Sequence, residues 1–398
     1  MNTIPKRTGC SACGTSIVHH QLTHFLNIID EVLDKTAKPL FSYIPLPNEA
    51  FLADRIFGIL TAGLHFIGLV RFNTDRSKVR SGRSELIWNE AVRRGIPMEQ
   101  IMVCGKYLEQ YRARLNDRWF YFVSIPIPPW MPQADYAWVD DKLKLAHRLK
   151  AANIPVPQAI LASSWEAALR AFGELKKPII IKPRFGSRSR HTTTNINTQE
   201  ELRVAFTLAK QVARELVLEE HIFGSVCRAT LVNGKLAGFF RANPPQIIGD
   251  GTQTIVALIA EKNKNRSERI GPIEITDDVT TFISRHGHSL ESILPQGALL
   301  DLSAKTGRFY GGYTKEMLPE IHPKMRTIFE KVAAMIDAPV LGFDLISTDP
   351  TADPDTMRWG IIECNGLPFI DLHYYALEGE PNDISPHIWN LWSTTPSA

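Results

Sequence analysis

Three oxygen-bearing side chains stand on two short apolar segments near the end of the sequence. Asp344 lies within residues 342–346, and Glu363 and Asn365 end a second apolar segment. Both segments have the length and the apolar content of buried strands, and the polar residues 349–355 between them are typical of a hairpin turn. Pairing of the two strands would bring the three side chains together. Carboxylate and amide oxygens are ligands that Mg²⁺ accepts, usually together with the phosphates of a nucleotide.

A lysine at the end of another apolar segment offers a partner for such phosphates. Lys182 belongs to the predicted buried strand of residues 178–183, and a flexible turn rich in Gly, Ser and Arg follows at 184–190. A lysine ammonium beside the backbone N–H groups of such a turn can hold phosphate oxygens. Each signal is weak by itself, because a carboxylate at a strand end is more often a turn cap or a solvated group. Together the two signals predict a nucleotide site.

The composition limits the class of protein. The chain has 398 residues, of which 44% are hydrophobic, so it can bury two or three domain cores. Forty-five basic residues against 42 acidic ones give a formal charge of +3, too balanced to indicate binding to nucleic acid or to an anionic membrane surface. The longest apolar run, residues 56–70, contains His65 and is too short to span a bilayer. Since no export segment follows Met1, we expect a soluble cytoplasmic protein.

Two further groupings of residues are less informative. Cys10 and Cys13 have the spacing of half a zinc site or of a redox pair, but the remaining cysteines are scattered. Because structural zinc needs four ligands, we expect no metal or redox role for this pair. A basic cluster near the apolar run fits a solvated loop better than a contact to an anionic substrate, and both interpretations stay open. Its members are Arg71, Arg76, Lys78, Arg80 and Arg83.

Alternating helical and extended patterns predict a small α/β domain at the start of the chain. Residues 22–33 carry apolar side chains at spacings of three and four, which is typical of a helix, and residues 101–104 and 119–125 have the pattern of short strands. Four prolines in residues 126–132 mark the predicted boundary of this domain.

Start and turn signals place the elements of the second predicted domain. Asp141 opens a helix, and capping boxes at Ser163 and Thr198 predict the starts of two more. Asn233-Gly234 predicts a tight hairpin turn, because both residue types tolerate positive φ.

Taken in order, the motifs of residues 138–375 resemble the ATP-grasp ligase family, and most closely the ATP-grasp modules of cyanophycin synthetase and of bifunctional glutathione synthetases. The most specific match is the stretch 241–255, with Arg241, the Ile-Gly-Asp-Gly series and a Thr-Ile pair that are particular to this subgroup. The resemblance covers about 60% of the chain. The other matches are Asp141-Lys142, residues 153–157, residues 181–183, Gly311-Gly312, His322-Pro323, residues 342–344 and residues 362–365.

The resemblance implies a fold of the α/β class, in the α+β form of ATP-grasp proteins. An N-terminal α/β domain would cover residues 1–130, and a two-lobed ATP-grasp domain would cover residues 138–385. Within the latter, residues 139–225 would form the small nucleotide-binding lobe and residues 226–385 the metal-binding and catalytic lobe.

The resemblance also implies a role for each matched side chain. The ATP-binding residues would be Lys142, Lys182, Ser187, Glu219, Glu220 and Ile222. The ligands of Mg²⁺, with Mn²⁺ as the alternative ion, would be Asp344, Glu363 and Asn365. Lys182 and Arg241 would be catalytic, and Arg241 would steady the acyl phosphate and the later tetrahedral intermediate, since preorganised cations at developing oxyanions are a large catalytic term.

The activity implied is that of an ADP-forming carboxylate–amine ligase that works through an acyl phosphate on amino acids or short peptides. The resemblance also implies a homo-oligomer. Departures from the family pattern are Arg188, Arg190 and His191 in the phosphate loop, Val226-Cys227 before Arg228, and residues 366–369 after Asn365. The first two leave open a nucleotide-binding accessory or sensor protein without turnover. The basic cluster around Arg71 to Arg83 leaves open a ligase that modifies a peptide or protein tail. Because no Walker A motif occurs, we expect a stand-alone ATP-grasp protein.

Overall fold

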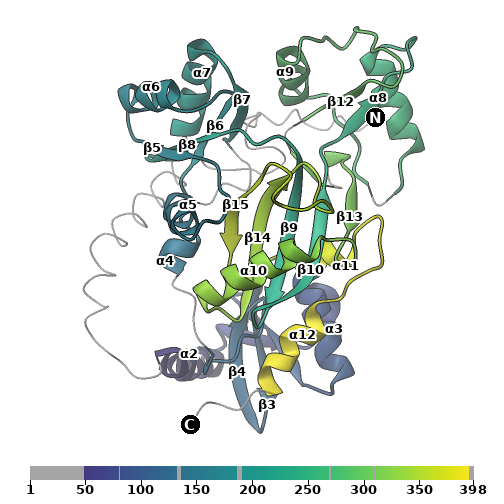
Figure 1. Ribbon diagram of the computed structural model, residues 1–398. Helices are drawn as coiled ribbons and strands as arrows, with labels where there is room; N and C mark the ends of the chain where they lie inside the picture. The colour runs from purple at the N-terminus through teal and green to yellow at the C-terminus, as the bar shows by residue number, and fades with distance from the viewer. Residues whose placement is uncertain are drawn as a thin grey trace.

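The computed structural model describes most of the chain after residue 48 (Figure 1). The described residues are 49–79, 81–131, 136–185, 191–268, 270–303, 305–307 and 310–393. Several sequence predictions fall outside them, namely the helix at 22–33, the Cys10–Cys13 pair, Arg80, Ser187, Arg188 and Arg190.

The first described part is a four-stranded antiparallel sheet in which the strands follow chain order. It consists of β1 (Val70–Asn73), β2 (Met98–Val103), β3 (Lys106–Leu115) and β4 (Arg118–Val123), with helices α2 (Glu49–Phe66) and α3 (Gly82–Arg93). The strands predicted at 101–104 and 119–125 correspond to β2 and β4. Leu86, Ile87 and Trp88 of α3 are buried in one cluster with Tyr111 and Ala113 of β3, so the amphipathic face of α3 holds the sheet.

The apolar run at 56–70 forms most of helix α2 and leads into β1. Many of its large side chains are exposed, including Ile59, Leu60 and Phe66. None of the helices among the described residues has both the length and the apolar content that crossing a membrane requires.

A second four-stranded sheet, in the order β5-β8-β6-β7, forms a small lobe. Its elements are β5 (Ala159–Ala162), α6 (Trp165–Glu174), β6 (Ile179–Pro183), β7 (Thr193–Ile196), α7 (Gln199–Lys210) and β8 (Leu216–Glu220). The two helices cover the sheet and share its core, with Phe172 and Leu202 packed in one cluster with Ile179, Ile181 and Leu218.

The two predicted helix starts in this lobe have different outcomes. The capping box at Thr198 is confirmed, because its hydroxyl accepts from the backbone N–H of Glu201 and the Glu201 carboxylate accepts from the backbone N–H of Thr198. The prediction of Ser163 as a cap is wrong by one residue: Ser164 is the N-cap and accepts from Ala167 N–H. Only Ser163 has a glutamate three residues later, but either serine can cap a helix, and the helix begins at Trp165, so Ser164 is the cap.

The central sheet has five strands in the order β13-β10-β9-β14-β15, and all neighbouring strands are antiparallel. The strands are β9 (Ser225–Val232), β10 (Lys235–Ala242), β13 (Thr314–Glu316), β14 (Val340–Ser347) and β15 (Trp359–Asn365). The predicted tight turn between β9 and β10 is confirmed, with φ of 50° at Asn233 and 73° at Gly234. The predicted hairpin between β14 and β15 is confirmed as well.

One face of the central sheet is covered by helices α5 (Lys142–Ala151) and α10 (Pro323–Ile336). Phe239, Leu341 and Phe343 of the sheet pack there against Leu149 and Phe329 of the helices. On the opposite face, Val232, Ala237 and Val340 pack with Ile370 and Ile384, and the polar residues Arg228 and Asp344 lie nearer the other end of β9 and β14.

An insertion between β10 and β13 forms its own small core beside the small lobe, at the top of Figure 1. It contains β11 (Gln246–Ile248), α8 (Ile255–Asn265), α9 (Asp277–Arg285) and β12 (Leu299–Asp301). Arg285 of α9 donates to Glu201 at 3.3 Å and to the carbonyl of Asn195 at 2.5 Å. The insertion is thereby linked to the small lobe.

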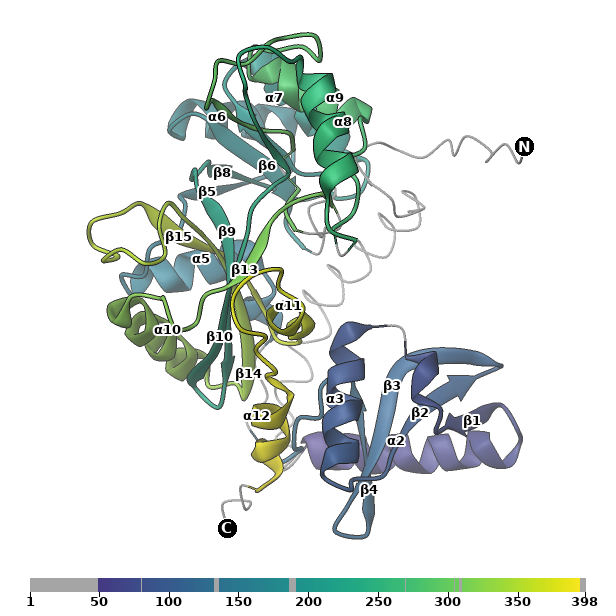
Figure 2. The ribbon, with the colours of Figure 1, turned by 90° about the vertical axis from the view of Figure 1, so that its right-hand side faces the viewer.

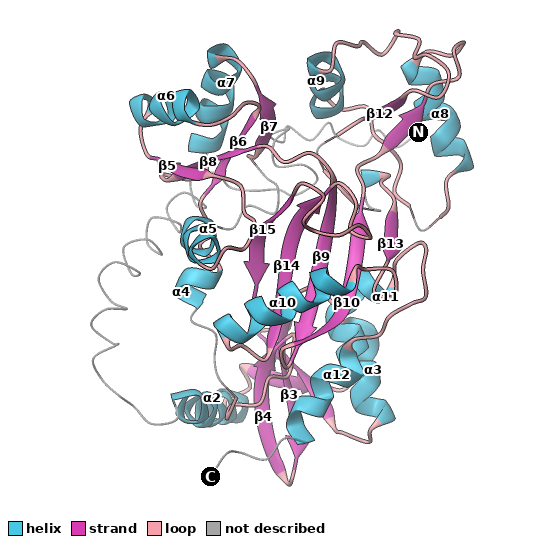
Figure 3. Ribbon diagram, viewed as in Figure 1, coloured by secondary structure: helices cyan, strands magenta, loops and turns pink. Residues whose placement is uncertain are grey.

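The end of the described chain returns to the first sheet (Figure 2). It carries α11 (Asp371–Tyr374), α12 (Ser385–Asn390) and the 3₁₀ turn η4 (Leu391–Ser393), whereas the short helix α4 (Tyr136–Val139) precedes α5. Figure 3 shows α12 beside α3, and the two helices are in contact. Trp389 is buried in the cluster that also contains Ile87 of α3.

Candidate active site

The register of β14 and β15 gathers the predicted metal ligands on the face of the central sheet that α5 and α10 leave uncovered. Asp344 is paired with Glu363, and Gly342 with Asn365. The Asn365 amide donates from Nδ2 to Asp344 Oδ2 at 3.5 Å. Side chains of directly opposite residues project from the same face of a sheet. The structure therefore brings Asp344, Glu363 and Asn365 together.

The two predicted phosphate lysines approach this group from the small lobe and from α5. Lys142, the first residue of α5, has its Nζ 4.0 Å from Glu363 Oε1 and donates to the carbonyl of Arg184 at 3.5 Å. Burial lowers the pKa of Lys142, and the nearby Lys182 charge acts in the same direction, while Glu363 opposes both. Lys182 donates to Glu219 Oε1 at 2.6 Å, and both side chains are buried. Two cations thus lie close together, Lys142 near Glu363 and Lys182 paired with Glu219.

Asp141 explains how Lys142 is held. As the N-cap of α5 it accepts from the backbone N–H groups of Leu143 and Lys144, at 3.1 and 3.3 Å. Its carboxylate also accepts two bonds from Arg184, at 3.0 and 2.5 Å. Arg184 follows β6 directly, so this ion pair connects the start of α5 to the strand that carries Lys182.

The segment predicted to flank adenine lies at the end of β8. The Glu219 carboxylate forms an ion pair with Lys182, whereas the Glu220 carboxylate lies 3.5 Å from the guanidinium of Arg358. Ile222 is buried and packs against β15, where a Cβ on Gly360 would lie only 2.8 Å from Ile222 Cδ1. A side chain at residue 360 would displace Ile222, so glycine permits this close approach.

His221, within the same segment, is held in its neutral form. Burial is the main cause that lowers its pKa to about 4, and the positive charges of His286, Arg285 and Arg358 contribute. Its Nδ1 has no hydrogen-bond partner among the described residues.

Arg241 is not brought to the other predicted site residues. It is paired with Cys227 on β9 and Lys315 on β13, and Cys227 is paired with Leu345. Asp344 pairs with Arg228 of β9, and Arg228 pairs with Phe240 of β10, the residue before Arg241. Because successive side chains of a strand point to opposite faces, Arg241 projects from the face that carries Cys227 and Leu345 rather than from the face of Asp344.

Arg228 is the cation that sequence reasoning missed. Its guanidinium donates from Nε and Nη2 to the two oxygens of Asp344, both at 2.6 Å. Its Nη1 is buried and has no hydrogen-bond partner among the described residues. A charged residue inside an otherwise apolar strand was the available signal. The Asn233-Gly234 turn alone could not show that Arg228 faces Asp344, because β14 joins β9 from far along the chain.

The donor set fits a divalent cation held jointly with phosphates. Two carboxylates and an amide are hard oxygen ligands of the kind that Mg²⁺ accepts. No group of three or more His, Cys, Asp or Glu side chains that could hold a metal is present in the described part of the chain. An ion bound by Asp344, Glu363 and Asn365 would therefore take further ligands from phosphates or water. Arg228 already engages both oxygens of Asp344, which leaves Glu363 as the more accessible carboxylate.

Comparisons with known proteins agree with this arrangement. The ATP-grasp domain family matches residues 139–365, which is more than half of the chain. Cyanophycin synthetase of Trichormus variabilis is 27% identical over 317 residues, which cover 77% of this chain and 34% of the relative. The glutathione biosynthesis bifunctional protein GshAB of Listeria welshimeri is 26% identical over 318 residues, covering 77% and 40%.

Among solved structures, the crystal structure of a bifunctional glutathione synthetase from Pasteurella multocida shares the fold. Its TM-score is 0.54 with 19% identity, over 79% of this chain and 44% of that chain. The chain spans 34% of the length of the cyanophycin synthetase that it matches. Given the family match, the two lysines opposite a strand pair with Asp344, Glu363 and Asn365, and the shared fold, this chain belongs to the ATP-grasp domain family.

Proposed function

We propose that the chain is an ATP- and Mg²⁺-dependent ligase that joins a carboxylate to an amine, with an amino acid or a short peptide as the carboxylate substrate. The observation that carries this proposal is the meeting of Lys142 and Glu363, with 4.0 Å between Nζ and Oε1. A lysine that can bind phosphate thus lies next to a carboxylate that can bind a metal ion. Lys182 adds a second buried cation beside the first.

The chemistry follows from charge. A carboxylate acylates poorly because its leaving group would be oxide, so it first attacks the γ-phosphate of ATP and gives an acyl phosphate and ADP. Lys142 and Lys182 neutralise the phosphate charge during this transfer. Mg²⁺, or Mn²⁺ in its place, supplies further charge neutralisation when held by Asp344, Glu363 and Asn365. The amine then attacks the activated carbonyl, loses a proton and displaces inorganic phosphate.

The proposal includes a division of the chain. Residues 1–130 would form an N-terminal α/β domain and residues 138–385 the ATP-grasp domain. The small lobe, residues 139–225, would hold the nucleotide. The lobe of residues 226–385 would hold the metal and the reacting groups. The sheet of β5, β8, β6 and β7 has a hydrophobic cluster of its own, which supports a separate small lobe, whereas Leu145 and Leu149 of α5 pack in the cluster of the central sheet.

Two observations favour a second candidate, a nucleotide-binding accessory or sensor protein without turnover. Both oxygens of Asp344 are engaged by Arg228. In addition, Arg241 projects from the other face of the sheet, so the cation implied for the acyl phosphate is not supplied by that residue. Arg228 is the cation paired with Asp344 across β9 and β14. Its Nη1, which has no hydrogen-bond partner among the described residues, would then bind the acyl phosphate in place of Arg241.

The test is phosphate release from ATP and Mg²⁺ by the purified protein, with pooled amino acids, dipeptides and acidic peptides. Acidic peptides are included because Arg71 and Arg76 are exposed. The variant Glu363→Ala is run beside Glu380→Ala, which removes an exposed carboxylate elsewhere. We expect ADP and phosphate in equal amounts with one pool only, at least a roughly hundredfold loss in Glu363→Ala, and no loss in Glu380→Ala. ATP binding by calorimetry without phosphate from any pool would instead support the sensor.

A further inference from the structure

A loop that directly follows the metal-binding strand is held by an arginine of the first sheet's helix α3. We propose that Arg83 is a positioning residue that fixes residues 366–369, and that α3 thereby shapes the side of the active site at which the carboxylate and the amine meet the γ-phosphate. This inference rests on the ligase function proposed above. It identifies a residue that would influence the binding of the carboxylate and amine substrates.

Arg83 contacts three residues of this loop and one residue of the first sheet. Its Nη1 donates to the carbonyl of Leu367 and, at 3.5 Å, to that of Pro368. Its Nη2 donates to Ser124 Oγ at 2.8 Å. The guanidinium carbon lies 4.8 Å from the centre of the Phe369 ring. The flat guanidinium is therefore bonded through its nitrogens and packed through its face, which a flexible ammonium cannot reproduce.

The other side of Arg83 is anchored in the first sheet. Ser124 is fully buried, and its backbone N–H donates to the carbonyl of Glu109 at 3.1 Å. The Glu109 carboxylate accepts from Ser84 at 2.8 Å and from Ser81 at 3.1 Å, and both serines lie at the start of α3. Arg83 thus joins a network that is fixed on β3 and α3 to a loop that belongs to the central sheet.

The loop is seated next to Asn365. Pro368 packs on β14, where a Cβ on Gly342 would lie only 2.5 Å from Pro368 Cβ. Gly342 is the strand partner of Asn365. The segment after the loop also contacts α3 closely, because a Cβ on Gly82 of α3 would lie 2.8 Å from Asp371 Oδ2. The start of α3 and the segment after Asn365 are therefore in close contact.

The order of residues along β15 shows which substrate the loop would serve. Ile222, from the predicted adenine segment, packs on Gly360 at one end of the strand. Glu363, with Asp344 opposite, lies in the middle, and Asn365 ends the strand beside Pro368. The loop is thus on the far side of the metal-binding residues from the nucleoside. A carboxylate that attacks the γ-phosphate must approach in line with the leaving ADP, from that far side.

The inference is tested with Arg83→Met, Arg83→Lys and Ser124→Gly in the full chain. Ser124 has a φ of 58°, which glycine adopts without strain, so Ser124→Gly removes the hydroxyl without requiring a new backbone conformation. The matched control is Arg114→Met. Arg114 is an exposed arginine of β3 in the same sheet, and its hydrogen bond to Asp117 at 3.1 Å does not reach the loop.

Two measurements are made on each variant, namely hydrogen exchange of the peptide covering 366–375 and the KM of each substrate. For Arg83→Met we expect faster exchange in this peptide, a rise of about tenfold or more in KM for the carboxylate or the amine, and a KM for ATP within about twofold of the wild type. Ser124→Gly should change the same quantities less, and Arg83→Lys should fall between Arg83→Met and the wild type. Arg114→Met should change neither.

Unchanged exchange in the 366–375 peptide of Arg83→Met would overturn the inference, and so would equal losses for ATP and for the other substrates. If the wild type itself turns over no ATP, the ligase proposal fails, and the exchange measurement still decides whether Arg83 fixes the loop. Thermal unfolding of each variant identifies a general loss of folding, in which case Ser124→Gly carries the decision.

Discussion

At the scale of single residues, Lys182 and Glu219 depend on each other. Their Nζ and Oε1 atoms are 2.6 Å apart, and both side chains are buried. Lys182→Met would remove a phosphate-binding cation and leave a buried carboxylate unpaired, which costs about 3–5 kcal/mol. We therefore expect both a lower unfolding temperature and a loss of at least about a hundredfold in ATP turnover.

The two effects of Lys182→Met are separated by the double variant with Glu219→Gln. This variant restores the balance of buried charge without restoring the cation, so its stability should recover while its turnover stays low. Lys176→Met, which removes an exposed lysine of the same lobe, is the control. Recovery of turnover in the double variant would show that Lys182 does not act on phosphate.

Arg228 pairs with Asp344 through two hydrogen bonds. In Arg228→Met the partly buried carboxylate of Asp344 would lose two hydrogen bonds of 2.6 Å. A bound cation would then replace the lost charge, so Mg²⁺ should raise the unfolding temperature of Arg228→Met more than that of the wild type. Calorimetric scans with and without Mg²⁺ measure this difference. The matched double variant Arg228→Met with Asp344→Asn should not show the larger response, and an equal response would argue against Asp344 as a ligand.

His221 gives the stability a dependence on pH. Its pKa is about 4 in the folded chain, mainly because of burial, against the ordinary value of 6.5. Between these two values the unfolded chain binds more protons than the folded one, so stability rises with pH through this window and is lost as pH falls from about 6.5 to about 4. The loss amounts to about 3 kcal/mol at most, since one pKa unit corresponds to about 1.4 kcal/mol.

The variant His221→Asn removes this titration, and the unfolding free energy should then fall less between pH 6.5 and pH 4 than it does in the wild type. Denaturant unfolding at several pH values measures the slope. His147→Asn, at an exposed histidine of α5, is the control. An unchanged slope in His221→Asn would mean that other groups cause the acid sensitivity.

At the scale of elements, the start of α6 is decided by one serine of an adjacent pair. The hydroxyl of Ser164 accepts from the backbone N–H of Ala167 at 3.2 Å, whereas Ser163 lies outside the helix. Ser164→Ala should cost about 1 kcal/mol of stability, and Ser163→Ala should stay within about 0.5 kcal/mol of the wild type. Chemical denaturation of the two variants measures the difference. Equal costs would show that the helix begins elsewhere.

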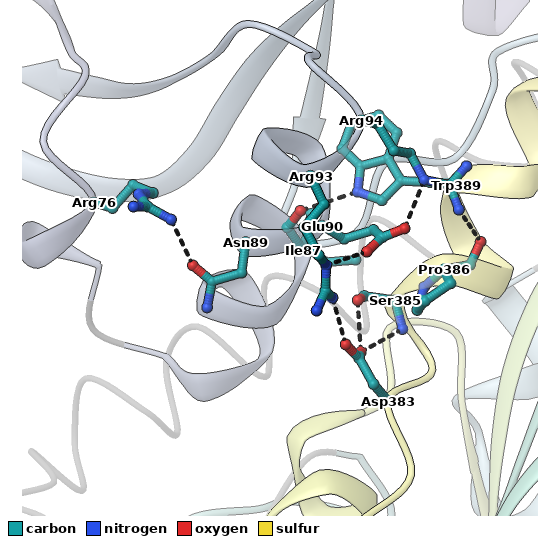
Figure 4. Close-up of polar contacts among 10 residues, drawn as sticks. All are labelled: Arg76, Ile87, Asn89, Glu90, Arg93, Arg94, Asp383, Ser385, Pro386 and Trp389. Carbon is teal, nitrogen blue, oxygen red and sulfur yellow. Dashed lines mark hydrogen bonds and ion pairs between the residues drawn. The ribbon is translucent and has the colours of Figure 1, made fainter.

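At the scale of the whole molecule, helix α12 fastens the end of the described chain to α3 (Figure 4). Trp389 is buried and donates from Nε1 to the carbonyl of Ile87 at 3.0 Å. Arg93 pairs with Asp383 at 2.7 Å, and Arg94 donates to the carbonyl of Pro386 at 2.9 Å. These contacts join residues about 300 positions apart and bring the first sheet to the central sheet.

Trp389→Ala should therefore weaken the attachment of α12 to the first sheet and cost about 3–5 kcal/mol, because a large buried ring is replaced by a cavity. Trp389→Phe keeps most of the apolar contact but leaves the Ile87 carbonyl without this donor, for which a cost of about 1–3 kcal/mol is expected. Thermal unfolding ranks the two variants. A smaller loss in Trp389→Ala than in Trp389→Phe would show that the packing is not what holds α12.

The sequence by itself determined the features that depend on neighbours along the chain. The Asn233-Gly234 turn, the capping box at Thr198 and the β14–β15 hairpin are each set by local backbone preferences and by alternation of side chains. Asp344 and Glu363 come together for the same reason, because a single hairpin fixes their register.

Tertiary structure alone decided which residues of different hairpins face one another. Arg228 meets Asp344, and Arg241 lies on the other face, because β14 pairs with β9 in one particular register. Lys182 meets Glu219 across β6 and β8, and Arg83 reaches the carbonyl of Leu367 from a different sheet. A shift of one residue in strand register would exchange the two faces of the central sheet. Such registers follow from packing of the whole core, which no local stretch of the sequence contains.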